Sequence, residues 1–153
     1  MLNNMDKDQY YMQQALELAK LAAQKDEVPI AALLVKDELI IAQAHNLCER
    51  LHDATAHAEL LVIQQASEKL QQARLTGTTL YVTIEPCPMC AGAIFLSRIE
   101  RVVYGALDSK AGGVHSLFNI LTHPNLNHQV QVTGGVLEQE CAMLVQEFFK
   151  KRR

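Results

Sequence analysis

The sequence predicts an α/β domain in which a mixed sheet of about five strands carries helices on both faces. Three observations support this prediction. Two apolar segments near the amino terminus adjoin each other as a hairpin, and later strand-like segments alternate with helix-like ones. The 153 residues, of which 49% are hydrophobic and 20% charged, suit one globular domain. No repeat, low-complexity tract or linker divides the chain, so a single domain is expected over residues 1–153.

The first half of the chain is expected to contain two helices and the hairpin. Apolar side chains recur at helical spacing over residues 8–24, which predicts the first helix. Two aliphatic runs, IAALLV (30–35) and LIIAQA (39–44), are separated by the polar sequence KDE and predict the paired strands of the hairpin. A second helix is expected over residues 55–70, where leucines and an isoleucine supply the apolar face.

The second half is expected to alternate strands with helices. The segment TTLYVTIE (78–85) is rich in β-branched residues, which favour strands. A proline suits the first turn of a helix, so a helix is expected over residues 88–97. RVVYGA (101–106) and QVQVTGGV (129–136) predict two further strands, and an amphipathic helix over residues 137–153 closes the chain.

The charge of the chain is unevenly distributed. Its 14 basic and 17 acidic residues give a net charge of −3, but four of the basic residues form the carboxyl terminus, KKRR (150–153). Without these four the balance is 10 − 17 = −7, so a basic tail follows an acidic body. Such a tail can contact phosphates, or it can be a helix end whose cations interact with the negative end of the helix dipole. The tail alone favours the second interpretation, a solvated helix end, because short basic motifs often occur without binding phosphates.

Cysteine content and hydropathy indicate a cytoplasmic protein that does not enter a membrane. Four cysteines in a chain of this length do not resemble a secreted disulfide scaffold. The amino terminus, MLNNMDKDQYYMQQ, lacks the apolar stretch of a signal peptide. The longest purely aliphatic run, IAALLV, is far shorter than the ~20 apolar residues that span a bilayer. We therefore expect reduced thiols.

Two segments place potential metal ligands where helices begin. In EPCPMC (85–90), Cys87 and Cys90 lie one helical turn apart at a strand-to-helix junction, and in TAHAE (55–59) His57 lies near the start of the preceding helix. Thiolates and imidazoles are ligands that Zn²⁺ prefers, and helix amino termini favour anionic ligands. A structural zinc site has four protein ligands, whereas a catalytic site keeps one position for water. With three ligands available, the sequence predicts a catalytic zinc.

Glu59 lies two residues after His57, close enough to face a water molecule without binding the metal. A carboxylate there can accept a proton as a base and later return it as an acid. The CxxC spacing alone also fits a redox pair or half of a structural zinc clip, although a redox pair needs neither His57 nor Glu59. His45 and Cys48 are interpreted as loop residues, and Cys141 as a core residue of the last helix.

The order H-x-E followed by P-C-x-x-C is the signature of zinc deaminases, which remove an exocyclic amino group from a base. From about residue 10 onward, the chain resembles one family of these enzymes, the bacterial tRNA-specific adenosine deaminases. The resembling segments are DEVPIAALLV, AHNLCERLHDATAHAEL, TLYVTIEPCPMCAGAI, SRIERVVYGALDSKAGG, SLFNIL, HPNLNHQVQV and FFKKRR. The resemblance implies the three-layer α/β/α cytidine deaminase-like fold and a homodimer with one Zn²⁺ per subunit. It also implies conversion of the wobble adenosine in the anticodon stem-loop of an arginine tRNA to inosine.

The resemblance also implies roles for individual residues. It makes His57, Cys87 and Cys90 the zinc ligands and Glu59 the proton shuttle. Asn46 corresponds to an asparagine that contacts the flipped nucleotide, a role that suits an amide because it is both donor and acceptor. The other implied contacts are Ala58, Asp108 and Lys110 with the substrate, and Phe149, Lys150, Lys151, Arg152 and Arg153 with the tRNA.

Two positions depart from the family pattern. Many relatives have glycine where this chain has Ala31 and His115. A methyl group at Ala31 can tighten the pocket or shift the first strand, and the imidazole of His115 can stack on RNA or obstruct it. Neither change affects the predicted zinc chemistry, so the sequence predicts the reaction type more directly than the tRNA preference.

Two other functions share the predicted metal ligands. A deaminase of a free base or nucleoside, such as guanine or cytosine, needs the same residues, but the basic tail and the long resemblance favour tRNA. A non-catalytic binding module stabilised by zinc needs no proton shuttle, so Glu59 argues against it. The range of tRNAs accepted and the catalytic rate do not follow from the sequence.

Overall fold

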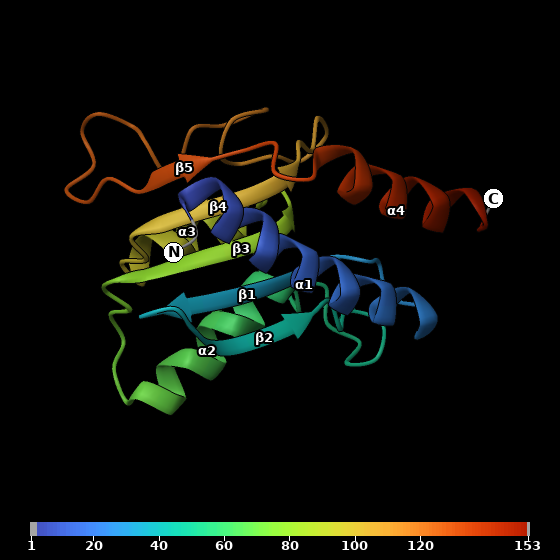
Figure 1. Cartoon of the computed structure of the whole chain (residues 1–153), viewed down its shortest axis with the longest axis horizontal. Helices are drawn as coiled ribbons and strands as arrows, with labels where there is room; N and C mark the ends of the chain where they lie inside the picture. Colours follow the sequence, from blue (N-terminus) through green and yellow to red (C-terminus); the bar gives the residue numbers. More distant parts are fainter. Residues whose placement is uncertain (1–2, 153) are drawn as a thin grey trace.

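Four helices and five strands form three layers in residues 3–152, the part of the chain that the computed structural model describes (Figure 1). The strands are β1 (Ala31–Lys36), β2 (Leu39–His45), β3 (Thr78–Ile84), β4 (Arg101–Ala106) and β5 (Gln131–Thr133). They form one sheet in the order β2-β1-β3-β4-β5. β1 runs antiparallel to both of its neighbours, whereas β3, β4 and β5 are parallel. The mixed sheet predicted from the sequence is confirmed.

Helices cover both faces of the sheet, as predicted. α1 (Asn4–Gln24) and α4 (Glu138–Lys150) pack on one face, and α2 (Ala58–Leu70) and α3 (Pro88–Leu96) pack on the other (Figure 1). Successive side chains of a strand point to opposite faces, so each layer has its own core. In β1, Leu33 contributes to the core beneath α1, whereas the next residue contributes to the core beneath α2. In the described part of the chain, no helix has the length and apolar character needed to cross a bilayer.

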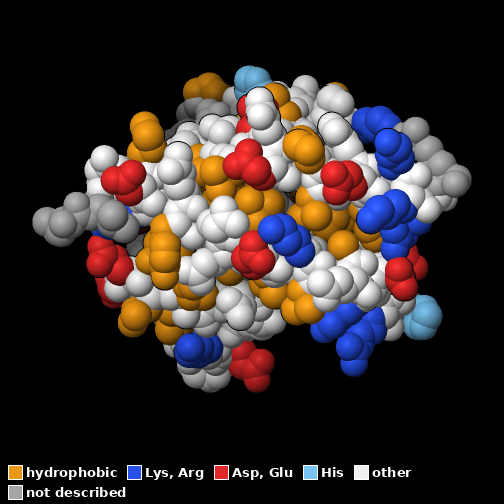
Figure 2. Space-filling model, turned by 45° about the vertical axis from the view of Figure 1, so that its right-hand side comes forward, with side chains coloured by type: hydrophobic (Ala, Val, Ile, Leu, Met, Phe, Trp, Pro, Cys, Tyr) orange, Lys and Arg blue, Asp and Glu red, His pale blue; other side chains and the backbone are white. Residues whose placement is uncertain are grey.

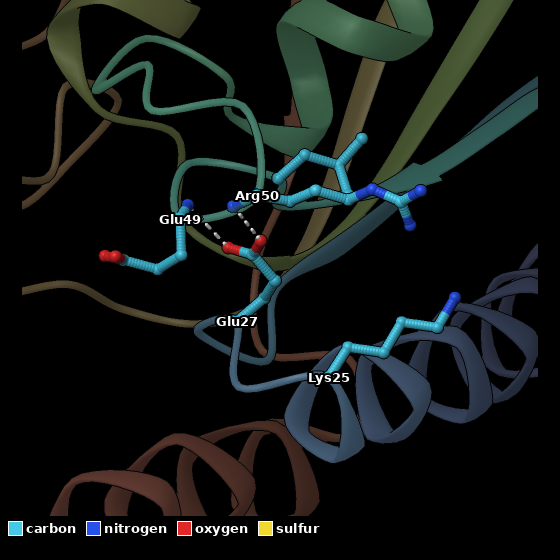
Figure 3. Close-up of a pocket in the computed structure, with 5 residues that line it drawn as sticks. Lys25, Glu27, Glu49 and Arg50 are labelled. Carbon is cyan, nitrogen blue, oxygen red and sulfur yellow. Dashed lines mark hydrogen bonds between the residues drawn. The ribbon is translucent and has the colours of Figure 1, made fainter.

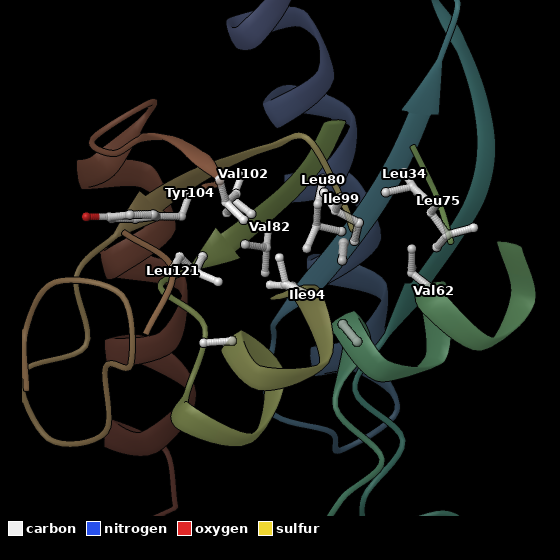
Figure 4. Packing of buried hydrophobic residues seen from close by; sticks show 14 of the residues in the cluster. Leu34, Val62, Leu75, Leu80, Val82, Ile94, Ile99, Val102, Tyr104 and Leu121 are labelled. Atoms are coloured by element: carbon white, nitrogen blue, oxygen red, sulfur yellow. The ribbon is translucent and has the colours of Figure 1, made fainter. Parts of the chain in front are cut away.

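The larger core lies between the sheet and helices α2 and α3 (Figure 4). Val62 of α2 and Ile94 of α3 are fully buried together with Leu80 and Val82 of β3. Burial of an aliphatic side chain of this size contributes roughly 1.5–3 kcal/mol. This core fixes the starts of α2 and α3 relative to the carboxyl end of β3, where the predicted functional residues lie.

Two helices begin three or more residues away from their predicted starts. α1 starts before residue 8, because the Asn3 side chain caps it by accepting a hydrogen bond from the Asp6 N–H at 2.8 Å. α2 starts at residue 58 and not at Thr55. Thr55 instead donates its N–H and its hydroxyl to the Asp53 carboxylate, at 2.8 and 2.6 Å, in a local turn.

β5 is shorter than the strand predicted over residues 129–136, because its ladder with β4 covers only 131–133 in the described chain. The next residue, Gly134, passes so close to Tyr104 that a Cβ there would lie 2.5 Å from the ring. Beyond the ladder, the N–H groups of Gly135 and Val136 still donate to carbonyl groups of β4, at 3.1 and 3.3 Å, before α4 begins. That helix is likewise shorter than the predicted range of 137–153.

A buried ionic network joins α1 to the sheet near the amino end of β4. Asp8 is 4% exposed and accepts two hydrogen bonds from the Arg101 guanidinium group, at 2.9 and 2.7 Å. Asp8 also accepts a hydrogen bond from the Tyr81 hydroxyl at 2.8 Å, and burial raises the pKa of Tyr81. Arg101 donates a further hydrogen bond to Thr133 Oγ1 at 2.9 Å. The network therefore connects α1 with β3, β4 and β5.

Candidate active site

The three predicted metal ligands come together where α2 and α3 begin. His57 is the N-cap residue of α2, Cys87 is the N-cap residue of α3, and Cys90 lies in the first turn of α3. His57 Nδ1 lies 3.5 Å from Cys87 Sγ and 3.4 Å from Cys90 Sγ. Tetrahedral coordination with ordinary Zn–N and Zn–S bonds gives a nitrogen-to-sulfur distance of about 3.6 Å. The three side chains therefore form a group that could hold a metal ion, and their donor atoms fit zinc.

The close approach of these groups shifts the pKa values of the two thiols in opposite directions. The interaction between the two thiols lowers the pKa of Cys87 to about 4 and raises the pKa of Cys90 well above its ordinary value. The hydrogen bond with Cys87 also raises the pKa of His57. A thiolate is the form of cysteine that binds a metal, so the arrangement favours a ligand at Cys87.

Glu59 lies in the first turn of α2 beside the metal-ligand group. Its side chain is 3% exposed, and burial raises its pKa to about 7. His57 lowers this pKa and Cys87 raises it, so the carboxyl group lies within electrostatic reach of both. A carboxyl group with a pKa near 7 can both accept and donate a proton at neutral pH.

Asn46 fixes the start of α2. Its Oδ1 accepts a hydrogen bond from the Ala58 N–H at 2.8 Å, and both residues are buried. This bond holds the backbone between His57 and Glu59. Among the hydrogen bonds of the described residues, the Asn46 Nδ2 amide has no protein acceptor, so it can donate to a ligand.

Glu27 anchors the loop that leads from β2 to α2, a feature that sequence reasoning missed. Its side chain is 2% exposed and accepts backbone N–H bonds from Glu49 at 3.0 Å and Arg50 at 2.8 Å (Figure 3). These residues, with Lys25 and Leu47, line a cavity of about 450 Å³. The only signal in the sequence is an acidic residue just before an apolar strand, and that signal does not indicate burial.

Glu85 anchors the loop that follows β4, and its role was also missed. The carboxylate is 3% exposed and accepts four backbone N–H bonds and one hydroxyl bond. The donors are the N–H groups of Asp108, Val114, His115 and Ser116 and the hydroxyl of Ser116. Although burial acts in the opposite direction, these hydrogen bonds lower the pKa of Glu85. The first residue of EPCPMC therefore holds the loop that follows β4.

The predicted substrate residues Asp108 and Lys110 lie in this loop. Asp108 Oδ1 accepts the N–H bonds of Lys110 at 3.0 Å and Ala111 at 3.1 Å, so its carboxylate stabilises a turn. Lys110 is exposed. Both residues line a second cavity, of about 840 Å³, together with Phe149 and Arg152 of the carboxyl-terminal segment. The structure thus brings these four predicted residues to one cavity.

Part of the basic end of the chain is engaged in contacts within the protein. Arg152 donates a hydrogen bond to Asp26 at 2.7 Å, and its guanidinium group lies 3.5 Å from the centre of the Phe148 ring. Lys150 and Lys151 are exposed, and predicted Arg153 lies outside the described residues. In Figure 2, Lys and Arg side chains gather toward the right-hand edge of the face, beside a broad area of apolar side chains.

The remaining residues singled out in the sequence have clear positions. Ala31 is fully buried and donates its N–H to Thr83 Oγ1 at 3.2 Å, whereas His115 is exposed. The interpretation of His45 as a loop residue was wrong, because it is the buried last residue of β2, whereas Cys48 lies in the following loop. Their side chains form local hydrogen bonds with the carbonyl groups of residues 46 and 54. Cys141 is 1% exposed within the core beneath α1 and α4, as predicted, and burial raises its pKa to about 12.

Comparisons with known proteins agree with this geometry. The family model of the MafB19-like deaminases matches residues 5–153. The chain is 52% identical over 149 residues to the tRNA-specific adenosine deaminase of Bacillus subtilis (strain 168), which covers 97% of this chain and 92% of that one. A chain solved in studies of A-to-I editing by tRNA:A34 deaminases at the wobble position of transfer RNA is 47% identical, with a TM-score of 0.84 and coverage of 88% and 98%. The guanine deaminase of Nitrosomonas europaea is 25% identical, with a TM-score of 0.76 and coverage of 97% and 85%.

Proposed function

Because the chain belongs to the tRNA-specific adenosine deaminases, within the MafB19-like deaminase family, we propose that it converts the wobble adenosine of a tRNA anticodon to inosine. The observation that carries the deamination is the group of His57, Cys87 and Cys90 with the buried carboxyl of Glu59 beside it. The choice of a tRNA substrate is supported by the identity to tRNA-specific adenosine deaminases. The substrate proposed is an arginine tRNA. A tRNA substrate also implies that the protein works in the cytoplasm.

We propose that the metal is Zn²⁺, one per subunit, held by His57, Cys87 and Cys90. The donor set and the nitrogen-to-sulfur distances support this choice. When bound, zinc would supply a Lewis acid that lowers the pKa of a water ligand from about 15.7 to about 7. The pKa of Cys87 is already low without a metal, so this residue needs little further change to serve as a ligand.

Glu59 would move the protons of the reaction. In the hydrolysis, a water oxygen forms a bond to C6 of adenine, and the bond from C6 to the exocyclic nitrogen breaks to release ammonia. Glu59 accepts a proton from the water and donates one to the ring nitrogen, then transfers the second proton to the departing amine. The pKa of about 7 supports both directions of transfer.

The surrounding residues would bind the nucleotide and its loop. The Nδ2 amide of Asn46 would donate to the flipped nucleotide, next to the backbone of Ala58. Asp108 and Lys110 would contact the anticodon loop from the loop after β4. Phe149 and the basic residues 150–153 would contact the tRNA outside the pocket, where phosphate contacts add affinity.

A second candidate function is deamination of a free base, and the fold shared with a guanine deaminase favours considering it. Both activities need the same metal ligands. They differ in whether the basic end of α4 matters, because a free base offers no phosphates. A non-catalytic zinc-binding module is the third candidate, and the buried Glu59 argues against it.

We also propose that the protein forms a homodimer through α3. Met89 and Leu96, which lie on the same side of this helix, are 38% and 72% exposed. Between them lie Gly92 and Ala93, which are small enough for another surface to approach closely. Light scattering should give the mass of a dimer for the native protein and of a monomer for Leu96→Glu. A monomeric native protein would contradict this proposal.

The activity is tested by incubating the zinc-loaded protein with an anticodon stem-loop of arginine tRNA that carries adenosine at the wobble position. Free adenosine, cytosine and guanine serve as parallel substrates. Inosine in the stem-loop, with little turnover of the small substrates, is the expected result. If zinc-loaded, folded protein leaves the stem-loop unchanged and deaminates a free base, the second candidate function replaces the first.

A further inference from the structure

We propose that Glu85 is a positioning residue that holds the loop over residues 107–119 in its binding conformation and thereby controls affinity for the RNA substrate. The inference rests on the proposed function for the identity of the substrate. Glu85 itself touches neither the metal-ligand group nor, in the proposal, the RNA. It acts through the loop that carries Asp108 and Lys110.

The hydrogen bonds of Glu85 converge from both ends of this loop. Oε1 accepts the Asp108 N–H at 3.0 Å and the Ser116 hydroxyl at 2.5 Å. Oε2 accepts the N–H groups of Val114, His115 and Ser116 at 3.2, 2.7 and 2.9 Å. One carboxylate therefore joins residue 108 to residues 114–116 and closes the loop.

The loop also packs directly on the segment that contains Glu85. A Cβ at Gly112 would lie 2.4 Å from the Glu85 carboxyl carbon, and a Cβ at Gly113 would lie 2.7 Å from Pro88. The Gly113 N–H donates to the carbonyl of Pro86 at 2.8 Å. Only glycine allows the backbone to approach Glu85 and Pro88 this closely. The two glycines and the Glu85 carboxylate therefore specify the path of the loop together.

Within residues 3–152, the charge of Glu85 is not balanced by a cation. Among the residues that the structure describes, no Lys or Arg forms an ion pair with Glu85. Its negative charge is stabilised instead by N–H and O–H dipoles that exist in this arrangement only when the loop is folded. The buried charge of Glu85 is therefore stable only when the loop is folded, and the loop keeps this fold only when the charge is present. A positioning role requires this mutual dependence.

Glu27 provides a matched comparison within the same protein. It is also a buried carboxylate that accepts backbone N–H bonds, but from Glu49 and Arg50 in the other loop, which leads to His57. Glu27→Gln should therefore loosen residues 46–57 and leave residues 107–119 unchanged. Glu85→Gln should loosen residues 107–119 and leave residues 46–57 unchanged, because the glutamine amide would direct its own N–H groups at the N–H donors of the loop.

The experiment compares zinc-loaded wild type, Glu85→Gln, Glu27→Gln and the exposed control Glu100→Gln by amide hydrogen exchange, zinc content and kinetics on the anticodon stem-loop. For Glu85→Gln we expect exchange in residues 107–119 to accelerate about tenfold, as for loss of a hydrogen bond to a charged group. We expect KM for the stem-loop to rise by a similar factor. Zinc content, kcat and the exchange of residues 46–57 should stay close to wild type.

Three further variants test the same contact independently. Gly112→Ala forces a methyl group against the Glu85 carboxyl and should reproduce the Glu85→Gln phenotype. Ser116→Ala removes one hydroxyl donor and keeps the backbone donors, so its effect should be smaller. Glu85→Asp keeps the charge and should recover part of the affinity.

Three outcomes would overturn the inference. The first is wild-type exchange of residues 107–119 in Glu85→Gln. The second is loss of zinc with a proportional fall in kcat at constant KM, which would mean a purely structural role. The third is equal loosening of both loops in either glutamine variant. If wild type itself fails to deaminate the stem-loop, the proposed function fails, whereas hydrogen exchange still decides whether Glu85 holds the loop.

Discussion

The two ends of the sheet stabilise buried carboxylates in different ways. At the amino end of β4, Asp8 pairs with the guanidinium of Arg101 and with the Tyr81 hydroxyl. At the carboxyl end of β3, Glu85 accepts bonds from backbone N–H groups and a hydroxyl, without a cation in the described chain. The first arrangement joins rigid elements, whereas the second specifies the conformation of a loop.

The different partners of the two buried carboxylates explain why the predicted functional residues lie at one end of the sheet. A side-chain ion pair joins α1 to the sheet and leaves loop conformations unspecified. Backbone N–H donors, by contrast, belong to the loop residues that must be positioned. Glu27 and Glu85 each accept such bonds from one loop, and the metal-ligand group lies between these two loops. The comparison predicts that variants at the amino end of the sheet change stability, whereas variants at the carboxyl end change activity.

The largest effect on activity is expected from Glu59. Glu59→Ala removes the proton shuttle, so kcat should fall by about 10²–10⁴-fold. Zinc content and the midpoint of urea unfolding should stay near wild type, because no metal ligand is removed. Inosine formation and metal analysis check the prediction, with Glu59→Gln as a variant of equal size that cannot carry the proton. Retention of more than a tenth of wild-type activity in both variants would exclude Glu59 as the shuttle.

The sequence predicted the group of potential metal ligands better than the residues that support it. His57, Cys87 and Cys90 could be predicted as neighbours because their spacing at two helix starts is characteristic, and the structure brings them together. The role of Glu59 as the proton shuttle stays a prediction. The order of helices and strands could also be predicted, because apolar periodicity reflects burial.

Other features depend on contacts between residues far apart in the chain. Glu27 and Glu85 are acidic residues near strands, and nothing in their local sequence shows that distant N–H groups surround them. In the sequence, nothing distinguishes Asp8 from an ordinary polar residue of a helix, because its partner Arg101 lies 93 residues later. The resemblance implied a nucleotide contact for Asn46, but its bond to the Ala58 N–H follows only from the fold.

The next largest effect is a loss of stability without a loss of chemistry. Arg101→Ala leaves the Asp8 carboxylate buried and unpaired, which should lower the free energy of unfolding by about 3–5 kcal/mol. Specific activity per folded, zinc-loaded molecule should remain near wild type. Urea unfolding measures the free energy of unfolding, and kinetics at urea concentrations below the unfolding transition measure the specific activity. The double variant Asp8→Asn/Arg101→Met removes both charges and should be more stable than Arg101→Ala; if it is less stable, the buried charge is not the cause.

A smaller effect is expected at the basic end of α4. The double variant Lys150→Gln/Lys151→Gln removes two exposed cations and keeps the pair between Arg152 and Asp26. KM for the stem-loop should rise about tenfold or less at low salt, and the logarithmic salt dependence should become shallower by up to about two. Lys36→Gln/Lys69→Gln changes the charge equally at other places and is the control. Equal effects of the two double variants would show that only net charge matters.

The smallest effect should come from the outer contact of the Asp8 network. Thr133→Val keeps the shape of the side chain and removes the oxygen that accepts the 2.9 Å hydrogen bond from Arg101. Because Arg101 retains both bonds to Asp8, the free energy of unfolding should fall by only about 1 kcal/mol. Activity and the hydrogen exchange of residues 107–119 should not change. A measurable rise in KM for the stem-loop would mean that the two ends of the sheet are coupled, and the division between stability and activity would then have to be abandoned.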